Sequence, residues 1–164
     1  MSQLTAILPE DLSIPVLAQT APLIVLGLTA CWLDWRDRRI PNWLCGILAV
    51  LGLAVAAWLG GGEAIAKHAI HAFAALIVGM VLFRFGVFGG GDAKFYAAVA
   101  AWFPIALWAK LLIHVSLAGL GLVTVWFVAR RLMGKKIRPK NPTKYDALPY
   151  GIAIALGAFW AMFA

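Results

Sequence analysis

One short segment combines glycines with a carboxylate between two long apolar stretches: Phe88-Gly89-Gly90-Gly91-Asp92-Ala93-Lys94. An ionised aspartate is costly at membrane depth, and each glycine destabilises a helix by about 1 kcal/mol relative to alanine. Packing alone would favour neither, so Asp92 is a candidate functional residue. The glycines would permit a positive φ or the close approach of a substrate backbone. The alternative is an interhelical turn whose acid only caps the next helix.

Asp34 is the second candidate, because it directly follows an apolar stretch that is expected to end at the same membrane face as Asp92. Two carboxyls that lie close together do not both ionise easily. One then keeps its proton while the other activates a water molecule, which is the chemistry of aspartic proteolysis. The alternative for Asp34 is an ion pair with a neighbouring arginine. Asp37 lies among arginines in the loop, where we expect it to be solvated and paired.

The expected helix ends predict how the two carboxyls differ. Asp92 would begin a helix, where the positive end of the helix dipole favours an anion, whereas Asp34 would end one, where the negative end disfavours it. We therefore expect Asp34 to carry the shared proton, unless the nearby arginines reverse the order.

The composition indicates a membrane protein. The chain has 164 residues, of which 63% are hydrophobic and 13% are charged, and its mean hydropathy is +0.90. A soluble domain of this size has too little interior to bury so much apolar surface, so lipid must act as a solvent. The two cysteines, Cys31 and Cys45, lie in apolar surroundings, and their spacing predicts core packing rather than a metal site or a disulfide.

Six apolar segments are each about long enough to cross a hydrocarbon layer of roughly 30 Å, when tilt and local thinning are allowed. We therefore predict one all-α, polytopic membrane domain over residues 1–164 with six transmembrane helices. The fourth segment is short and contains Pro104, so it could be a partial span. Gly60-Gly61-Gly62 is expected to form a flexible turn after the second segment. The six segments are 16–33, 43–59, 65–83, 95–108, 111–129 and 148–163.

The distribution of Lys and Arg predicts the orientation. Of the 14 basic residues, 12 fall on one side of the six-span arrangement, and only Lys67 and Lys110 fall on the other. By the positive-inside rule the first side is cytoplasmic, so the carboxyl pair lies at the cytoplasmic face and both termini face away from it. This asymmetry accounts for the net charge of +7 without nucleic acid. The basic segment 130–144 suits anionic lipid headgroups or an acidic partner, although topology determination alone would explain it.

Three motifs occur in a fixed order along the chain. Asp34 is followed by Ile40-Pro41-Asn42, the glycine-aspartate segment continues to Lys94, and Pro149-Tyr150-Gly151 precedes the last apolar segment. This ordered set resembles the type IV prepilin peptidases, which are membrane aspartic proteases of the GxGD class. The resemblance runs from Cys31 to the C-terminus. The glycine-aspartate motif alone is weak evidence, whereas the combination on a six-span frame is strong.

The resemblance implies cleavage of a short basic leader from type IV pilin-like precursors at the cytoplasmic face of the inner membrane. It implies Asp34 and Asp92 as the catalytic pair, without a metal or other cofactor, and a prepilin-like substrate and membrane lipids as partners. For the motif at 149–151, a simple entry turn into the last span is the alternative. The remaining motif residues would receive the substrate or shape the cleft: Pro41, Asn42, Gly89, Gly90, Gly91, Lys94, Pro149 and Gly151.

The chain departs from the bifunctional members of that family, because it has none of the Cys-x-x-Cys motifs that they use for zinc binding beside an N-methyltransferase activity. It therefore looks like the short, peptidase-only form associated with Flp-type (tight adherence) pili. The archaeal preflagellin peptidases are similar in plan and stay an alternative. Presenilin-like proteases share Gly-x-Gly-Asp, but they carry a Tyr-Asp pair and a Pro-Ala-Leu motif, and this sequence has neither.

Two other functional classes compete with a protease. A small transporter or channel subunit would also carry acids in the membrane, but a path across it needs polar groups at several depths, whereas these acids gather at one face. A non-catalytic subunit of a secretion apparatus would not need an intact aspartate pair. The oligomeric state and the cleavage sequence stay open.

Overall fold

The computed structural model describes residues 14–134 and 148–164, and these residues form helices joined by short turns. The expectation of an all-α fold is confirmed. The basic residues at positions 135–144 lie outside the described residues. In chain order the elements are α1 (Ile14–Asp37), α2 (Asn42–Arg84), α3 (Gly90–Ala100), the 3-10 helix η2 (Ile105–Leu107), α4 (Trp108–Leu132) and α5 (Tyr150–Phe163).

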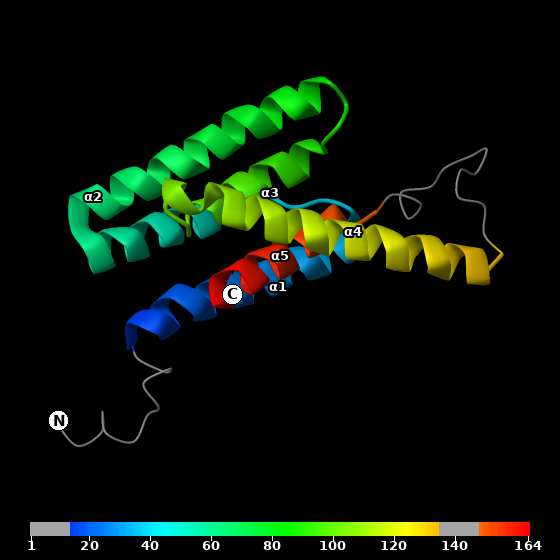
Figure 1. Ribbon diagram of the computed structural model, residues 1–164, viewed down its shortest axis with the longest axis horizontal. Coiled ribbons are helices and arrows are strands. Elements are labelled where there is room, and N and C mark those ends of the chain that lie inside the picture. Colours follow the sequence, from blue (N-terminus) through cyan, green and yellow to red (C-terminus); the bar gives the residue numbers. More distant parts are fainter. Residues whose placement is uncertain (1–13, 135–147) are drawn as a thin grey trace, which may run out of the picture.

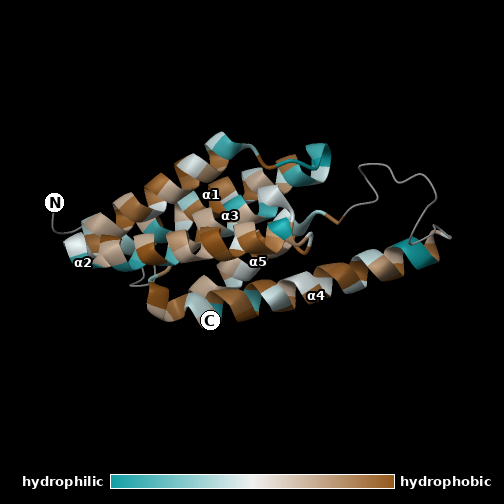
Figure 2. Cartoon of the chain, turned by 90° about the horizontal axis from the view of Figure 1, so that it is seen from above, coloured by the Kyte–Doolittle hydropathy of each residue, from teal (hydrophilic) through white to brown (hydrophobic). Residues whose placement is uncertain are grey.

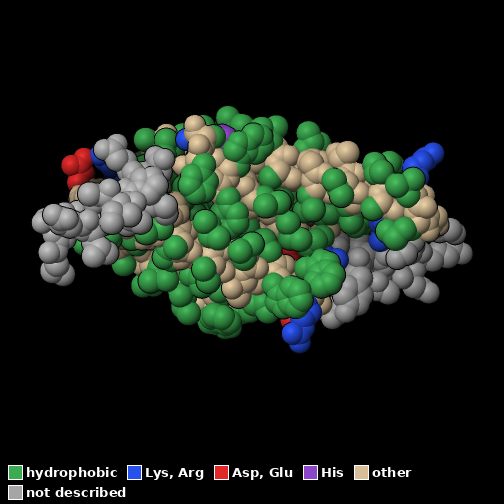
Figure 3. Space-filling view, turned by 90° about the horizontal axis from the view of Figure 1, so that it is seen from below, with side chains coloured by type: hydrophobic (Ala, Val, Ile, Leu, Met, Phe, Trp, Pro, Cys, Tyr) green, Lys and Arg blue, Asp and Glu red, His purple; other side chains and the backbone are tan. Residues whose placement is uncertain are grey.

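The surface and the helix lengths identify a membrane protein. Three stretches of the described residues are long and apolar enough to cross a membrane: Ile14–Asp37, Asn42–Arg84 and Ile105–Leu132. Large apolar side chains such as Phe73 and Leu120 are about two-thirds exposed, which suits lipid better than water. Hydrophilic residues gather near the helix ends (Figure 2). The face in Figure 3 is mostly hydrophobic, with Lys and Arg side chains toward its margins.

Helix α2 is a hairpin rather than one straight rod. Gly61 has φ 63° and ψ −153°, a conformation that is essentially restricted to glycine, and the chain reverses there. Figure 1 shows the two arms lying side by side. They correspond to the predicted segments 43–59 and 65–83, so the glycine triplet forms the turn that the sequence predicted.

The fourth predicted segment differs from the structure in its extent. Helix α3 begins at Gly90 and already ends at Ala100, because Pro104 lacks an N–H group and cannot continue a helix. Two buried histidines of α2 donate hydrogen bonds into the turn that follows, from Nδ1 of His68 to the Ala101 carbonyl and from Nδ1 of His71 to the Phe103 carbonyl, both at 2.9 Å. Segment 95–108 is therefore not one continuous helix, which agrees with the alternative of a partial span interrupted at Pro104, and the count of six spans stays a prediction.

Close packing around small residues holds α3 and α5 inside the bundle. Phe95 of α3 is fully buried, and a Cβ atom on Gly79 of α2 would lie 2.9 Å from the Ala93 side chain. Helix α5 approaches α4 so closely that a Cβ on Gly157 would overlap the Val115 backbone. Small residues at helix interfaces allow this approach, which in membranes replaces the hydrophobic effect as a source of stability.

The chain directions place several helix ends together. The end of α1, both ends of the α2 hairpin and the starts of α3 and α5 lie at one end of the molecule, and the Gly61 turn lies at the other (Figure 1). This shared end is the one that the basic residues predict to be cytoplasmic. Which membrane face it occupies stays a prediction.

Candidate active site

Asp34 lies in the last turn of α1 and is only 6% exposed. Its Oδ2 atom accepts a hydrogen bond of 2.9 Å from the backbone N–H of Gly151. Gly151 is the second residue of α5, where the N–H groups have no partner within the helix. The carboxyl of Asp34 therefore occupies the positively polarised end of α5.

The need for glycine at position 151 follows from this contact. A Cβ atom there would lie 2.8 Å from both Asp34 Oδ2 and Ile40 Cδ1, so a side chain would displace the carboxyl or the loop. Pro149 is buried and directly precedes α5. The motif at 149–151 is thus the entry turn of α5 and, at the same time, part of the wall around Asp34.

Asp92 lies in the first turn of α3 and is half-buried. A Cβ atom on Gly89 would lie 2.5 Å from Asp92 Oδ2, so a side chain at this position would meet the carboxyl. Gly89, Gly90 and Gly91 all lack a positive φ. Neighbouring groups approach closely at Gly89 and Gly90, whereas a Cβ on Gly91 would make only an ordinary contact, and none of the three uses the left-handed conformation that favours glycine.

The two carboxyls belong to one site although 58 positions separate them in the sequence. Ile40 touches both sides of it, because Gly151 faces its side chain and a Cβ on Gly91 would lie 3.9 Å from its backbone nitrogen. Asp92 lies outside the three stretches that are long and apolar enough to cross a membrane. Burial, followed by the negative charge of Asp34, raises the pKa of Asp92 to about 6. The charge of Asp34 therefore reaches Asp92.

The contacts of the two carboxyls favour a different proton order from the one expected from α1 and α3 alone. Burial disfavours charge on both groups, but only Asp34 has compensation, from the Gly151 N–H and the charge of Arg38. Asp92 accepts no hydrogen bond from the described residues. The geometry therefore favours the proton on Asp92, because the N-terminus of α5 supplies a second helix dipole that the local sequence does not reveal.

The other motif residues fix the loop beside the carboxyls. Lys94 Nζ donates a hydrogen bond of 3.1 Å to Asn42 Oδ1, which joins α3 to the start of α2. Pro41 directly precedes α2, and its carbonyl accepts from the first free N–H groups of that helix. Gly90 faces the ring of Phe83, 3.3 Å from the position of a Cβ. These contacts hold the position of Ile40 and therefore the shape of the site.

Asp37 is outside the site. It is exposed, and its Oδ1 lies 3.6 Å from Nε of the equally exposed Arg36, which agrees with the expected solvated pair. Within residues 14–134 and 148–164, no group of three or more His, Cys, Asp or Glu side chains could hold a metal ion. Cys31 and Cys45 are free thiols.

A comparison with protein families agrees with these motifs. The model of the type IV leader peptidase family matches residues 21–126, which is more than half of the chain and includes Asp34 and Asp92. The chain belongs to this family. Comparisons with curated proteins and with solved structures gave no match. Family membership implies a peptidase with a prepilin-like substrate in general, and the apolar helices agree with a membrane location.

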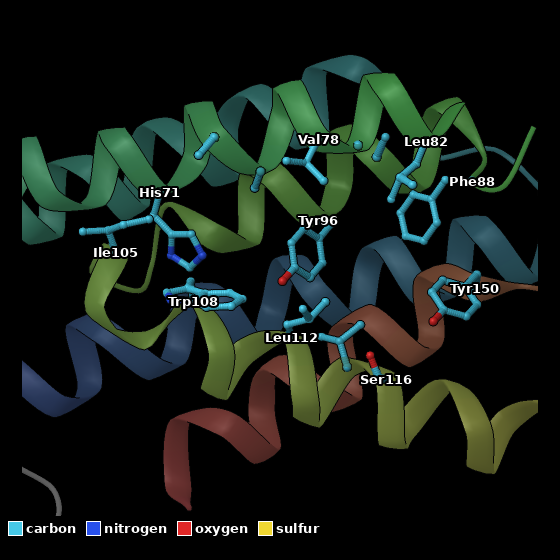
Figure 4. Close-up of a pocket in the computed structure, with 15 residues that line it drawn as sticks. His71, Val78, Leu82, Phe88, Tyr96, Ile105, Trp108, Leu112, Ser116 and Tyr150 are labelled. Atoms are coloured by element: carbon cyan, nitrogen blue, oxygen red, sulfur yellow. The ribbon is translucent and has the colours of Figure 1, made fainter. Parts of the chain in front are cut away.

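This leader peptidase also has an apolar cavity of about 330 Å³ between α2, α3, α4 and α5. Ala93 and Phe88 line the cavity on the side of Asp92, and Tyr150 lines it next to Gly151 (Figure 4). The hydroxyl groups of Tyr96 and Ser116 are polar groups in the otherwise apolar cavity wall. The sequence analysis missed Tyr96, although its place four residues after Asp92 puts both on one helix face.

Proposed function

We propose that this member of the type IV leader peptidase family is an aspartic endopeptidase of the GxGD type that removes the leader from prepilin-like precursors at the cytoplasmic membrane face. The observation that carries the proposal is the meeting of Asp34 and Asp92, from distant parts of the sequence, in one site where the charge of one raises the pKa of the other. An unpartnered acid that keeps its proton beside an ionised one is the arrangement that aspartic proteolysis requires.

The contacts of the two carboxyls support a different role for each. Ionised Asp34, oriented by the Gly151 N–H, takes a proton from a water molecule whose oxygen attacks the scissile carbonyl carbon. Asp92 gives its proton to the carbonyl oxygen, and a gem-diol forms. The C–N bond then breaks as Asp34 returns its proton to the leaving nitrogen and Asp92 regains a proton from the diol. The products are a carboxylic acid and an amine.

The apolar cavity beside Asp92 supports a substrate with an apolar segment next to the scissile bond. Two residues that line the cavity are sequence neighbours of the site: Ala93 directly follows Asp92, and Tyr150 directly precedes Gly151. A peptide placed between the two carboxyls could therefore extend apolar side chains into this cavity while its polar leader stays at the basic end of the bundle.

The test is incubation of the purified protein with a type IV pilin-like precursor in H₂¹⁸O, followed by mass spectrometry of both products. We expect one cut after the leader, one ¹⁸O atom in the new carboxyl group, no N-methylation of the new amine and full activity in the presence of chelators. The double variant Asp34→Asn/Asp92→Asn is the background control. Cleavage by this variant, or loss of wild-type activity on chelation with recovery on adding a divalent metal, would contradict the proposal.

A further inference from the structure

Arg38 has an unusual backbone conformation next to the carboxyl pair. Its φ of 55° is the only positive φ of a non-glycine residue in the described part of the chain. Its N–H donates a hydrogen bond of 3.0 Å to the Asp34 carbonyl and so closes the last turn of α1. Glycine is the usual residue in this position, because the left-handed conformation is unfavourable for residues with a Cβ atom. The side chain of Arg38 therefore has to be explained by something other than the turn.

The guanidinium group of Arg38 is partly buried without adequate partners. Its Nε and Nη1 atoms are inaccessible and have no hydrogen-bond partner in the described residues. Its charge acts on the Asp34 carboxyl, but none of the ion pairs found within 14–134 and 148–164 includes Arg38. A guanidinium cannot lose its proton, and buried donors without acceptors destabilise a protein. Two charged donors are thus held ready beside the site.

The neighbouring arginines do not share these properties. Arg36 is exposed and lies beside Asp37, and Arg39 is exposed. Topology determination and lipid contact explain such exposed charges, but neither explains buried nitrogens. A pure partner for Asp34 would form a close ion pair, and a pure helix-ending residue would be glycine.

We propose that Arg38 is a substrate-positioning residue: its guanidinium group turns out of its buried position toward the bound precursor, and its Nε and Nη1 groups donate hydrogen bonds to backbone carbonyl oxygens next to the scissile bond. This inference rests on the proposed function. An extended peptide presents carbonyl oxygens along its length, and charge-assisted hydrogen bonds to them are stronger than neutral ones. Substrate binding would supply the acceptors that the protein itself does not, and it would hold the scissile carbonyl between Asp34 and Asp92.

The decisive variant is Arg38→Gly, because it relaxes the backbone while it removes the donors. We expect an unfolding temperature equal to or above that of the wild type, together with a loss of about 10²-fold in kcat/KM, chiefly through KM, from two lost charge-assisted hydrogen bonds. Arg38→Lys keeps the charge near Asp34 but lacks the planar donors, so it should keep the pH profile and still lose about tenfold. Arg39→Gln is the matched control and should cleave like the wild type.

Two outcomes would overturn the inference. One is an Arg38→Gly protein whose kcat/KM lies within about twofold of the wild-type value. The other is a loss that disappears when the assay pH is raised, since Arg38 would then act only on the ionisation of Asp34. Both require that the wild type and Arg39→Gln cleave the precursor. Absence of cleavage by these two proteins would instead contradict the proposed function.

Discussion

At its C-terminal end, α3 runs into a turn whose Ala101 and Phe103 carbonyls each accept a hydrogen bond from a buried histidine, while at its N-terminal end Asp92 accepts none from the described residues. The same turn is also held by Trp102, whose Nε1 donates a hydrogen bond of 3.0 Å to the Leu48 carbonyl. At the end of the molecule where α3 begins, by contrast, two nitrogens of Arg38, whose charge acts on Asp34, are buried without partners among the described residues.

The difference teaches how to separate structural from functional polar groups in an apolar bundle. Buried polar groups are normally paired, because an unpaired group carries its full desolvation penalty. The turn at 101–104 follows this rule, so its histidines are explained by the fold. The end with Asp92 and Arg38 breaks it, and unpaired groups there can be satisfied by a bound peptide and a water molecule.

The largest effect on the comparison should come from Gly151→Ala, which disturbs the hydrogen bond from the Gly151 N–H to the Asp34 carboxyl. The new methyl group would meet Asp34 Oδ2 and move the carboxyl, and small displacements of reacting groups reduce rates by about 10²-fold. Gly121→Ala is the control, because nothing lies within 4 Å of that position. Steady-state cleavage kinetics measure both. Equal activities of the two variants would show that the contact with Gly151 does not orient Asp34.

The paired end should respond in stability and not in activity. His68→Leu leaves the Ala101 carbonyl without its donor, which should lower the free energy of unfolding by about 2 kcal/mol. His114→Leu is the control, since the hydrogen bond of His114 stays within its own helix, to the Lys110 carbonyl, and leucine keeps an apolar contact with the Trp160 ring; it should change stability much less. Thermal unfolding gives the stability, and cleavage per folded molecule should stay near the wild-type value. A His68→Leu protein of normal stability and low activity would place His68 in the catalytic machinery.

The smallest expected effect is on the pH dependence of the free energy of unfolding, to which Asp92 contributes. Its pKa is raised by burial and by Asp34 to about 6, so the folded protein binds a proton that the unfolded chain releases near pH 4. The contribution of Asp92 to stability is therefore present at low pH and lost as pH rises through about 6. Asp92→Asn removes this loss.

Its unfolding temperature should match that of the wild type at a pH of about 4 and exceed it by a few degrees at about 7.5. Asp37→Asn, at an exposed position, is the matched control. A destabilised Asp92→Asn protein at the higher pH would mean that Asp92 is a paired structural group after all.

The sequence was informative wherever a feature depends on neighbouring residues. Apolar runs predicted the helices, the glycine triplet predicted the Gly61 turn, and the arginines around Asp37 predicted its exposure. Features that depend on tertiary contacts were not accessible. The early end of α3 is stabilised by His68 and His71, more than 30 positions away. The Gly151 N–H reaches Asp34 across 117 positions, and this contact favours the opposite of the proton order that the local helix ends suggested.

The burial of the Arg38 side chain could not be predicted either, because the local sequence does not distinguish Arg38 from its neighbours Arg36 and Arg39. Its spacing of four residues from Asp34 would place it on the same helix face. The left-handed backbone that ends α1 is visible only in the structure.

The most direct test of the account compares the single variants Asp34→Asn, Asp92→Asn and Asp37→Asn in the precursor cleavage assay, with folding verified by unfolding temperature. Asparagine keeps the size of the side chain but cannot exchange the required proton. Both site variants should therefore lose about 10³-fold or more in kcat, whereas Asp37→Asn should keep most activity because an exposed pair contributes less than about 1 kcal/mol. Full activity of a folded Asp92→Asn protein would contradict the account.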